Sequence, residues 1–137
     1  IDFAHTPEAM EKLLSQLSIN YKEKIYLVFG CGGDRDKGKR PKMGAIAEKY
    51  ATKIFLTSDN SRSESPDEII DMIAAGIKDK LKIQINIDRE KAIQLAINSM
   101  SQDNVLVVAG RGHENFQIDQ GNRLKFSDRE IVKKCLA

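Results

Sequence analysis

The sequence predicts an α/β fold of the Rossmann type, with a mostly parallel sheet flanked by helices on both faces and a C-terminal β-hairpin. Three short and almost wholly apolar runs, Lys24–Phe29, Ile54–Thr57 and Val105–Ala109, are typical of strands that are covered on both faces. Segments with helical periodicity separate them, which is the pattern of a parallel sheet with crossover helices. The 137 residues fit one domain, spanning 1–137.

The first half of the chain is expected to hold two helices. Thr6 can cap a helix at about Pro7–Leu17, where proline suits the first position and apolar side chains recur at helical spacing. The strand at Lys24–Phe29 follows, and it ends at a glycine. Pro41 is expected to open the next helix, which leads to the strand at Ile54–Thr57.

The second half continues the alternation. Ser65 is expected to cap a helix that runs to about Ile77, because two carboxylates follow it in the positively charged first turn. A shorter strand is predicted at Ile83–Ile87. Asp88 is expected to cap a further helix through about Met100, which precedes the last apolar strand.

The rhythm changes near the C-terminus. Phe116–Ile118 and Arg123–Phe126 flank a turn at Asp119–Asn122, which predicts a β-hairpin. A last helix is expected to start at Ser127 or Asp128.

Composition bounds the class of protein. The chain has 22 Lys+Arg against 20 Asp+Glu, and only Arg35–Lys42 is densely basic, which argues against a protein that coats nucleic acid. Cys31 and Cys135 lie far apart, so a reduced, cytoplasmic setting is expected.

No apolar run approaches the roughly 18 residues that span a bilayer, and no membrane association is predicted. Ile1–His5 lacks an initiator Met and reads like the exit from a strand, so we expect a domain of a longer protein.

Three polar segments follow the three long strands: Cys31–Arg40, Asp59–Arg62 and Gly110–Glu114. Ligands of open α/β sheets bind beyond the carboxyl ends of the strands, so these segments are the candidate site. One sequence does not give the strand order, and their convergence is therefore an expectation from the fold class.

The segment Gly30–Arg40 combines glycines and alternating charges with a nearby helix N-terminus, which predicts anion binding. It matches neither a Walker A loop nor a dinucleotide-binding fingerprint. A solvated, flexible loop would account for the composition equally well. Cys31 has no histidine close in sequence and is interpreted as a packed loop cysteine.

The other two segments contain groups that suit a zwitterion. Asp59–Arg62 is ordinary turn chemistry except for Arg62, whose guanidinium can bind a carboxylate through two hydrogen bonds. Glu114 offers an anion to an ammonium group, and Gly110 leaves a carbonyl accessible. His113 is expected to be structural and bonded to the backbone, and no metal site and no catalytic residue is assigned.

Four stretches together, Asp2–Pro7, Gly30–Pro41, Asp59–Arg62 and Gly110–Glu114, resemble the Mur ligase family over the length of the chain, and Gln117 adds to the match. The block Gly-Cys-Gly-Gly-Asp-Arg-Asp-Lys-Gly-Lys-Arg-Pro is specific to it. The resemblance is to the C-terminal domain. It implies that an N-terminal UDP-binding domain and a central ATPase domain lie outside this chain.

Within that family the chain resembles the members that add meso-diaminopimelate, which carry Asp-Asn-Pro-Arg at the second segment. Here the specificity motif is Asp59, Asn60, Ser61 and Arg62, and serine in place of proline is expected to make the turn less rigid. The resemblance implies that the diaminopimelate-binding residues are Arg35, Asn60, Arg62, Gly110 and Glu114.

The resemblance also implies a reaction. ATP phosphorylates a carboxylate of a UDP-N-acetylmuramoyl dipeptide, and the amine of diaminopimelate attacks the acyl phosphate. ATP and Mg²⁺ are expected to be bound mainly by the central domain, with Asp2 and His5 on the nucleotide side of this one. The C-terminal domain would rotate to deliver the amino acid, and alone it is expected to be inactive.

Three alternatives remain open on the sequence. The chain could be the corresponding domain of a lysine-adding Mur ligase or of a folate-adding ligase. It could also be a Rossmann-like module that binds a nucleotide or phosphate without catalysis.

Overall fold

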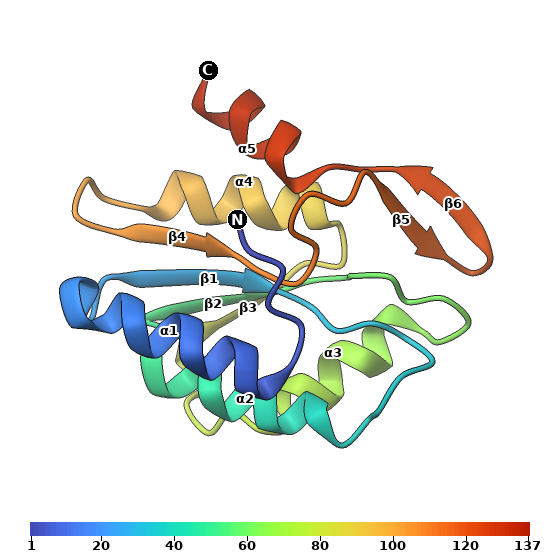
Figure 1. Ribbon diagram of the computed structural model, residues 1–137, viewed down its shortest axis with the longest axis horizontal. Helices are drawn as coiled ribbons and strands as arrows, with labels where there is room; N and C mark the ends of the chain where they lie inside the picture. Colours follow the sequence, from blue (N-terminus) through green and yellow to red (C-terminus); the bar gives the residue numbers. More distant parts are fainter.

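The computed structural model describes all 137 residues, and it shows a parallel sheet between two helical layers (Figure 1). The sheet has the order β3-β2-β1-β4, with all neighbouring strands parallel. Its strands are β1 (Ile25–Phe29), β2 (Lys53–Leu56), β3 (Ile83–Ile85) and β4 (Val105–Val108). The α/β fold predicted from the sequence is confirmed.

Helices cover both faces of the sheet, as predicted (Figure 1). One layer consists of α1 (Pro7–Tyr21), α2 (Lys39–Tyr50) and α3 (Pro66–Ala74). The other consists of α4 (Arg89–Ser99) and α5 (Asp128–Leu136), and a short 3₁₀ helix, η1 (Lys80–Lys82), precedes β3. No helix is both long and apolar enough to pass through a bilayer.

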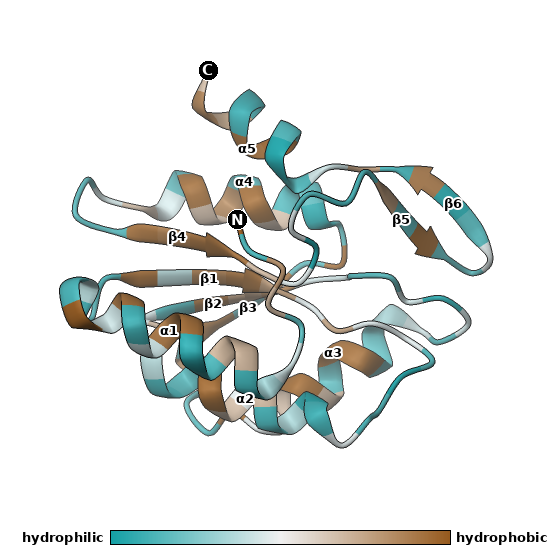
Figure 2. Ribbon diagram, in the orientation of Figure 1, coloured by the Kyte–Doolittle hydropathy of each residue, from teal (hydrophilic) through white to brown (hydrophobic).

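The apolar strands are buried because each face packs against one helical layer. In β1, Ile25, Leu27 and Phe29 belong to the core beneath α1, α2 and α3. Tyr26 and Val28 belong to the core beneath α4. Figure 2 shows the resulting apolar strands between amphipathic helices. Each fully buried aliphatic side chain of this kind contributes about 1.5–3 kcal/mol.

Several helix boundaries differ from the prediction. α1 continues past Leu17 to Tyr21 and ends where Lys22, with a ψ of 132°, leaves the helical conformation. α2 begins at Lys39 rather than Pro41, and proline is tolerated there because the first-turn N–H groups need no partner within the helix. α3 ends at Ala74.

The predicted caps are mostly confirmed. Thr6 Oγ1 accepts a hydrogen bond from Ala9 N at 3.1 Å, and Asp88 Oδ1 accepts one from Lys91 N at 3.3 Å. Ser65 occupies the N-cap position of α3, as predicted, but its side chain makes no capping hydrogen bond. Helix α3 instead begins with proline, whose fixed φ suits the first helical position.

The predicted hairpin forms from β5 (Phe116–Asp119) and β6 (Asn122–Lys125) and makes a separate two-stranded sheet. Gln120 and Gly121 form its two-residue turn with φ values of 51° and 80°, the geometry that matches the twist of a hairpin. A single parallel bridge between Arg62 and Asp119 connects the hairpin to the rest of the backbone pairing.

The order of the strands decides where a ligand can bind. From β1 the chain adds β2 and β3 on one side, and it adds β4 on the other. The order therefore reverses between β1 and β4, and such switch points open a crevice at the carboxyl ends of the strands.

Candidate functional site

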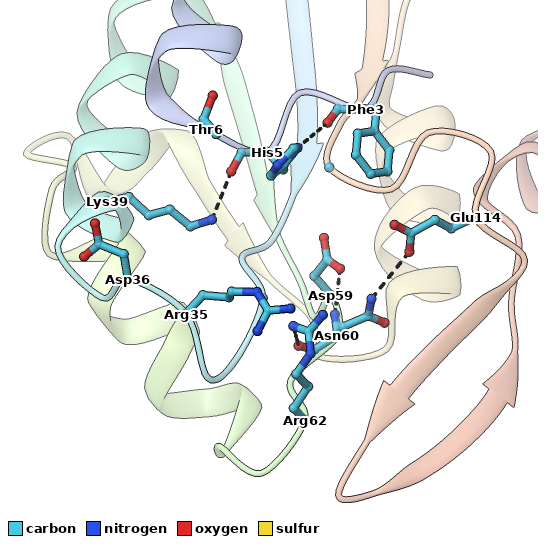
Figure 3. Close-up of a pocket in the computed structure, with 12 residues that line it drawn as sticks. Phe3, His5, Thr6, Arg35, Asp36, Lys39, Asp59, Asn60, Arg62 and Glu114 are labelled. Carbon is cyan, nitrogen blue, oxygen red and sulfur yellow. Dashed lines mark hydrogen bonds between the residues drawn. The ribbon is translucent and has the colours of Figure 1, made fainter.

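A pocket of about 410 Å³ lies at this switch point (Figure 3). It brings together the three polar segments that follow β1, β2 and β4, together with the stretch before α1, so the convergence expected from the sequence is confirmed. Only one hydrophobic residue lines it, and the lining consists of Phe3, His5, Thr6, Gly32, Arg35, Asp36, Lys39, Asp59, Asn60, Arg62, Gly110 and Glu114.

Two of these segments touch through their backbones. Gly33 N donates to Asn60 O at 2.7 Å. A Cβ at Gly33 would lie 1.8 Å from Ser61 O, so any side chain there would force the segments apart. Gly33 thus permits a close approach of the two loops.

An ion pair between Arg40 and Glu64 also joins the segments that follow β1 and β2. Arg40 is fully buried, and its two terminal nitrogens lie 3.1 and 2.7 Å from the carboxylate oxygens of Glu64. Arg40 also donates to Gly32 O at 3.0 Å. Hydrogen bonding from Arg40 and from the backbone of Asp34 lowers the pKa of Glu64 to about 2. In the sequence Arg40 is only one member of a basic cluster, and no local pattern indicates this role.

Two guanidinium groups lie at one end of the pocket (Figure 3). Arg62 donates from Nη1 to Gly33 O at 3.0 Å and to Asn60 O at 3.2 Å. Arg35 is exposed and bonded only to its neighbour, with Nη1 3.1 Å from Asp34 O. Both groups retain N–H donors for an anion, because a guanidinium has five.

The carboxylate of Glu114 lies across the pocket and is held by Asn60. Asn60 Nδ2 donates to Glu114 Oε2 at 3.4 Å, while Asn60 Oδ1 accepts from Ile118 N at 2.8 Å. Gly110 has a φ of 109°, and a Cβ there would lie 2.9 Å from a carboxylate oxygen of Asp59. The five residues expected to bind diaminopimelate therefore line one pocket, which Asp36, Lys39 and Asp59 line as well.

Comparison with known proteins assigns the chain. Residues 1–112 match the family described as Mur ligase, glutamate ligase domain. The chain belongs to the Mur ligase family. A ligase of Buchnera aphidicola is 50% identical over 137 residues, and one of Prochlorococcus marinus (strain MED4) is 46% identical over 136 residues. Both are named UDP-N-acetylmuramoyl-L-alanyl-D-glutamate–2,6-diaminopimelate ligase.

Solved structures agree with this assignment. A structure of a ligase of the same name superposes with a TM-score of 0.91 at 38% identity over 98% of this chain. Folylpolyglutamate synthase from Thermotoga maritima superposes with a TM-score of 0.55 at 20% identity over 78% of the chain, which shows a shared fold alone. Alignments with the two curated ligases cover 99% of this chain but 27% of each of theirs.

In this Mur ligase domain the two residues predicted to lie on the nucleotide side, Asp2 and His5, occupy different places. His5 lines the pocket, with Nδ1 3.0 Å from Phe3 O. Asp2 lies outside it and extends the edge of the sheet, because its N donates to Val108 O at 2.9 Å and its carbonyl accepts from Gly110 N at 3.0 Å.

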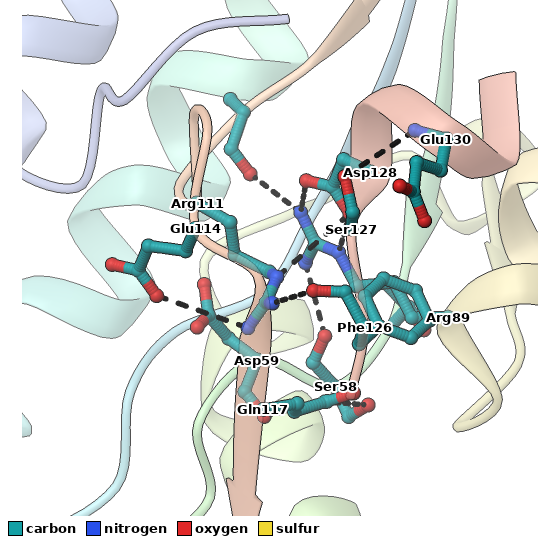
Figure 4. A network of polar contacts seen from close by, with 12 residues as sticks. Ser58, Asp59, Arg89, Arg111, Glu114, Gln117, Phe126, Ser127, Asp128 and Glu130 are labelled. Carbon is teal, nitrogen blue, oxygen red and sulfur yellow. Dashed lines mark hydrogen bonds and ion pairs between the residues drawn. The ribbon is translucent and has the colours of Figure 1, made fainter. Parts of the chain in front are cut away.

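Two further arginines of the Mur ligase domain are fully buried behind the pocket (Figure 4). Arg89 donates from Nε and Nη2 to the two carboxylate oxygens of Asp128, each at 2.7 Å. It also donates to Ser58 O at 3.0 Å and to Ala109 O at 3.1 Å. One side chain of α4 thus holds the ends of β2 and β4 and the start of α5. No motif in the sequence marked Arg89 or Asp128.

Arg111 holds the hairpin by hydrogen bonds in a similar way. Its Nη2 donates to Phe116 O at 2.9 Å and to Phe126 O at 3.0 Å, which clamps the two ends of the hairpin. Burial and the nearby charge of Arg89 lower the pKa of Arg111. Arg111 lies inside a segment that the sequence marked as ligand-binding, but its side chain is structural.

Two further residues that the sequence singled out, Cys31 and His113, do not line the pocket. Cys31 is buried, its Sγ lies 3.6 Å from Met43 Sδ, and burial raises its pKa to about 12, so the packed cysteine predicted from the sequence is confirmed. His113 is exposed without a hydrogen bond, so the prediction of a backbone-bonded histidine is wrong. Gly112, rather than His113, lies against Phe3, because a Cβ at Gly112 would lie 3.0 Å from the Phe3 ring.

Metal binding needs oxygen, nitrogen or sulfur ligands that converge, and no group of three or more His, Cys, Asp or Glu side chains does so here.

Proposed function

We propose that this chain is the C-terminal domain of an ATP-dependent ligase that adds meso-diaminopimelate to UDP-N-acetylmuramoyl-L-alanyl-D-glutamate in peptidoglycan synthesis. The pocket at the switch point would bind the incoming diamino acid. One observation carries this proposal: a pair of guanidinium groups and a carboxylate line the same small polar pocket from different strand ends.

A diamino acid with two carboxylates fits that distribution of charge. Arg62 and Arg35 would bind the distal carboxylate, for which the planar guanidinium is the best partner among side chains. Glu114 and the carbonyl of Gly110 would bind the ammonium group. L-Lysine has no distal carboxylate and would leave the two cations without a partner, so the pocket favours diaminopimelate over the lysine-adding alternative.

Asn60 takes a narrower role in this proposal than the resemblance implies. Its amide oxygen is already bonded to Ile118 N and to Arg111 Nη1, at 2.8 and 3.3 Å, and its amide nitrogen points at Glu114. It has one amide hydrogen left for a ligand, and it orients the carboxylate that binds the ammonium.

The reaction itself would need the domains outside this chain. ATP and Mg²⁺ would be bound mainly there, and the acyl phosphate of the dipeptide would form there. This domain would hold the amino group in line with that acyl phosphate and exclude water on closing, with Asp2 and His5 on the nucleotide side. The isolated domain is expected to be inactive. Both cysteines are free thiols, in keeping with a cytoplasmic location.

The test is ligation by the full-length enzyme, supplied with ATP, Mg²⁺ and the UDP-muramoyl dipeptide, with phosphate release measured for meso-diaminopimelate and for L-lysine. Release that depends on diaminopimelate is expected. A preference for lysine would assign the lysine-adding reaction instead. No release with either amino acid would favour a binding module without catalysis.

A further inference from the structure

Arg62 is held in an unusual backbone conformation by the hairpin. Its φ of 53° lies in the left-handed region, which is unfavourable for a residue other than glycine. Arg62 N donates to Ile118 O at 3.2 Å, and Arg62 O accepts from Gln120 N at 2.7 Å. Both backbone groups of this arginine are thus bonded to β5 and its turn, on either side of Asp119.

A side-chain bond joins the same two segments next to that bridge. Ser61 Oγ donates to Asp119 Oδ1 at 2.8 Å, and Ser61 is only 1% exposed. A buried hydroxyl without a partner is costly, so this bond stabilises the position of the serine. We call the Ser61–Asp119 hydrogen bond the latch. From the sequence, serine in place of proline was expected to make the turn at residues 59–62 less rigid. The latch instead constrains that turn.

The neighbouring residues are tied to β5 as well. Gln117 Nε2 donates to Asp59 O at 2.8 Å, and Ile118 N donates to Asn60 Oδ1 at 2.8 Å. The segment 59–62 and β5 therefore form one hydrogen-bonded unit, and the pocket side of that unit presents the guanidinium of Arg62 (Figure 3).

Polar bonds, rather than a core, decide where the hairpin lies. All four residues of β6 are exposed, and no residue of β5 is fully buried. Hydrophobic burial accordingly does little to place β5 against the segment 59–62. Removing the latch should weaken the attachment of the segment 59–62 to the hairpin without opening either hydrophobic core, while the backbone bonds of Arg62 to Ile118 and Gln120 remain.

We propose that Ser61 and Asp119 are positioning residues for amino-acid selection: the latch fixes Arg62 where it can meet the distal carboxylate of the incoming diamino acid. This inference rests on the proposed function, since it assumes that Arg62 binds that carboxylate. Ser61 and Asp119 do not line the pocket, so they would act through Arg62.

The test uses the full-length enzyme and the variants Ser61→Ala, Asp119→Ala and the double variant. Asp119→Asn keeps a side-chain oxygen that can accept from Ser61, so it is the conservative variant. Ser18→Ala is the matched control, because it removes a serine hydrogen bond of 2.7 Å near the far end of α1. For each variant kcat and KM are measured with diaminopimelate, and KM with ATP.

A hydrogen bond of this kind contributes about 1 kcal/mol, so the latch variants should raise KM for diaminopimelate about fivefold to tenfold. Their kcat and KM for ATP should stay within about twofold of wild type, because a lost positional constraint acts on one substrate only. The double variant should be no worse than the single ones, and Asp119→Asn should restore most of the affinity.

Three results would overturn the inference: an unchanged KM for diaminopimelate, an equal rise in the KM for ATP, or additive effects in the double variant. The wild-type enzyme separates this failure from that of the proposed function. If wild type does not use diaminopimelate, the function and the inference fail together; if it does and the latch variants match it, only the inference fails.

Discussion

Arg40 and Glu64 belong to segments that follow different strands, and they form an ion pair with Nη2 and Oε2 2.7 Å apart, in which the arginine is fully buried and the glutamate side chain is 14% exposed. Arg40 belongs to α2, close to Arg35, and Glu64 lies two residues after Arg62. The pair therefore sets the distance between the segments that supply the two guanidinium groups of the pocket.

We expect the ion pair between Arg40 and Glu64 to make the free energy of unfolding depend on pH in the acid range. The pKa of Glu64 is lowered from 4.5 to about 2 in the folded chain, so its contribution is present above about pH 4.5 and is lost as the pH falls towards 2. Glu64→Gln should remove this part of the pH dependence. Urea unfolding of both proteins between pH 7 and about pH 2 measures it, and parallel stability curves would contradict it. Glu68→Gln, an exposed glutamate of α3, is the control.

Asp128 is the only carboxylate bonded to Arg89, and both side chains are fully buried. Asp128→Asn should destabilise the domain by about 3–5 kcal/mol, because the change leaves a buried guanidinium without its counter-charge. Urea unfolding at neutral pH measures the loss. Asp103→Asn, at an exposed site, should change the free energy of unfolding by less than about 0.5 kcal/mol. Equal effects of the two changes would refute the proposed role of the buried pair.

Cys31 should resist alkylation in the native protein. Burial raises its pKa to about 12, so the thiol stays protonated at pH 8 and is shielded from reagents. Cys135, which is half-buried near the C-terminus, should react first with iodoacetamide. Peptide mass analysis after timed labelling distinguishes the two, and denatured protein should label at both. Fast labelling of Cys31 in the native state would contradict its assignment as a packed residue.

Arg62→Ala should lower kcat/KM for diaminopimelate about 100-fold in the full-length enzyme, since roughly 3 kcal/mol of charged hydrogen bonding is lost. The KM for ATP should not change. Arg123→Ala is a matched control, because this exposed hairpin arginine stacks on Phe116 and lies outside the pocket. Unchanged kinetics with diaminopimelate would remove the basis for the specificity of the pocket.

The sequence predicted the strands and helices well because local patterns encode them. Continuous apolar runs identified β1, β2 and β4, and the caps at Thr6 and Asp88 placed two helix starts. Helix ends were less accurate, because the last turn of α1 places its apolar residues, Ile19 and Tyr21, in solvent and so departs from the core-facing spacing. The ligand-side segments could be located because strand ends and loop charge are local properties too.

By itself the sequence determined the alternation of strands and helices, the polar loops after the strands, and the residues that resemble the Mur ligase motifs. Only the tertiary structure decided which of those residues meet in the pocket and which are buried supports. Arg111 and Arg62 look alike in sequence, yet one clamps the hairpin and the other faces the pocket. The reason is that burial and hydrogen-bond partners come from segments far apart in the chain, and no local pattern specifies them.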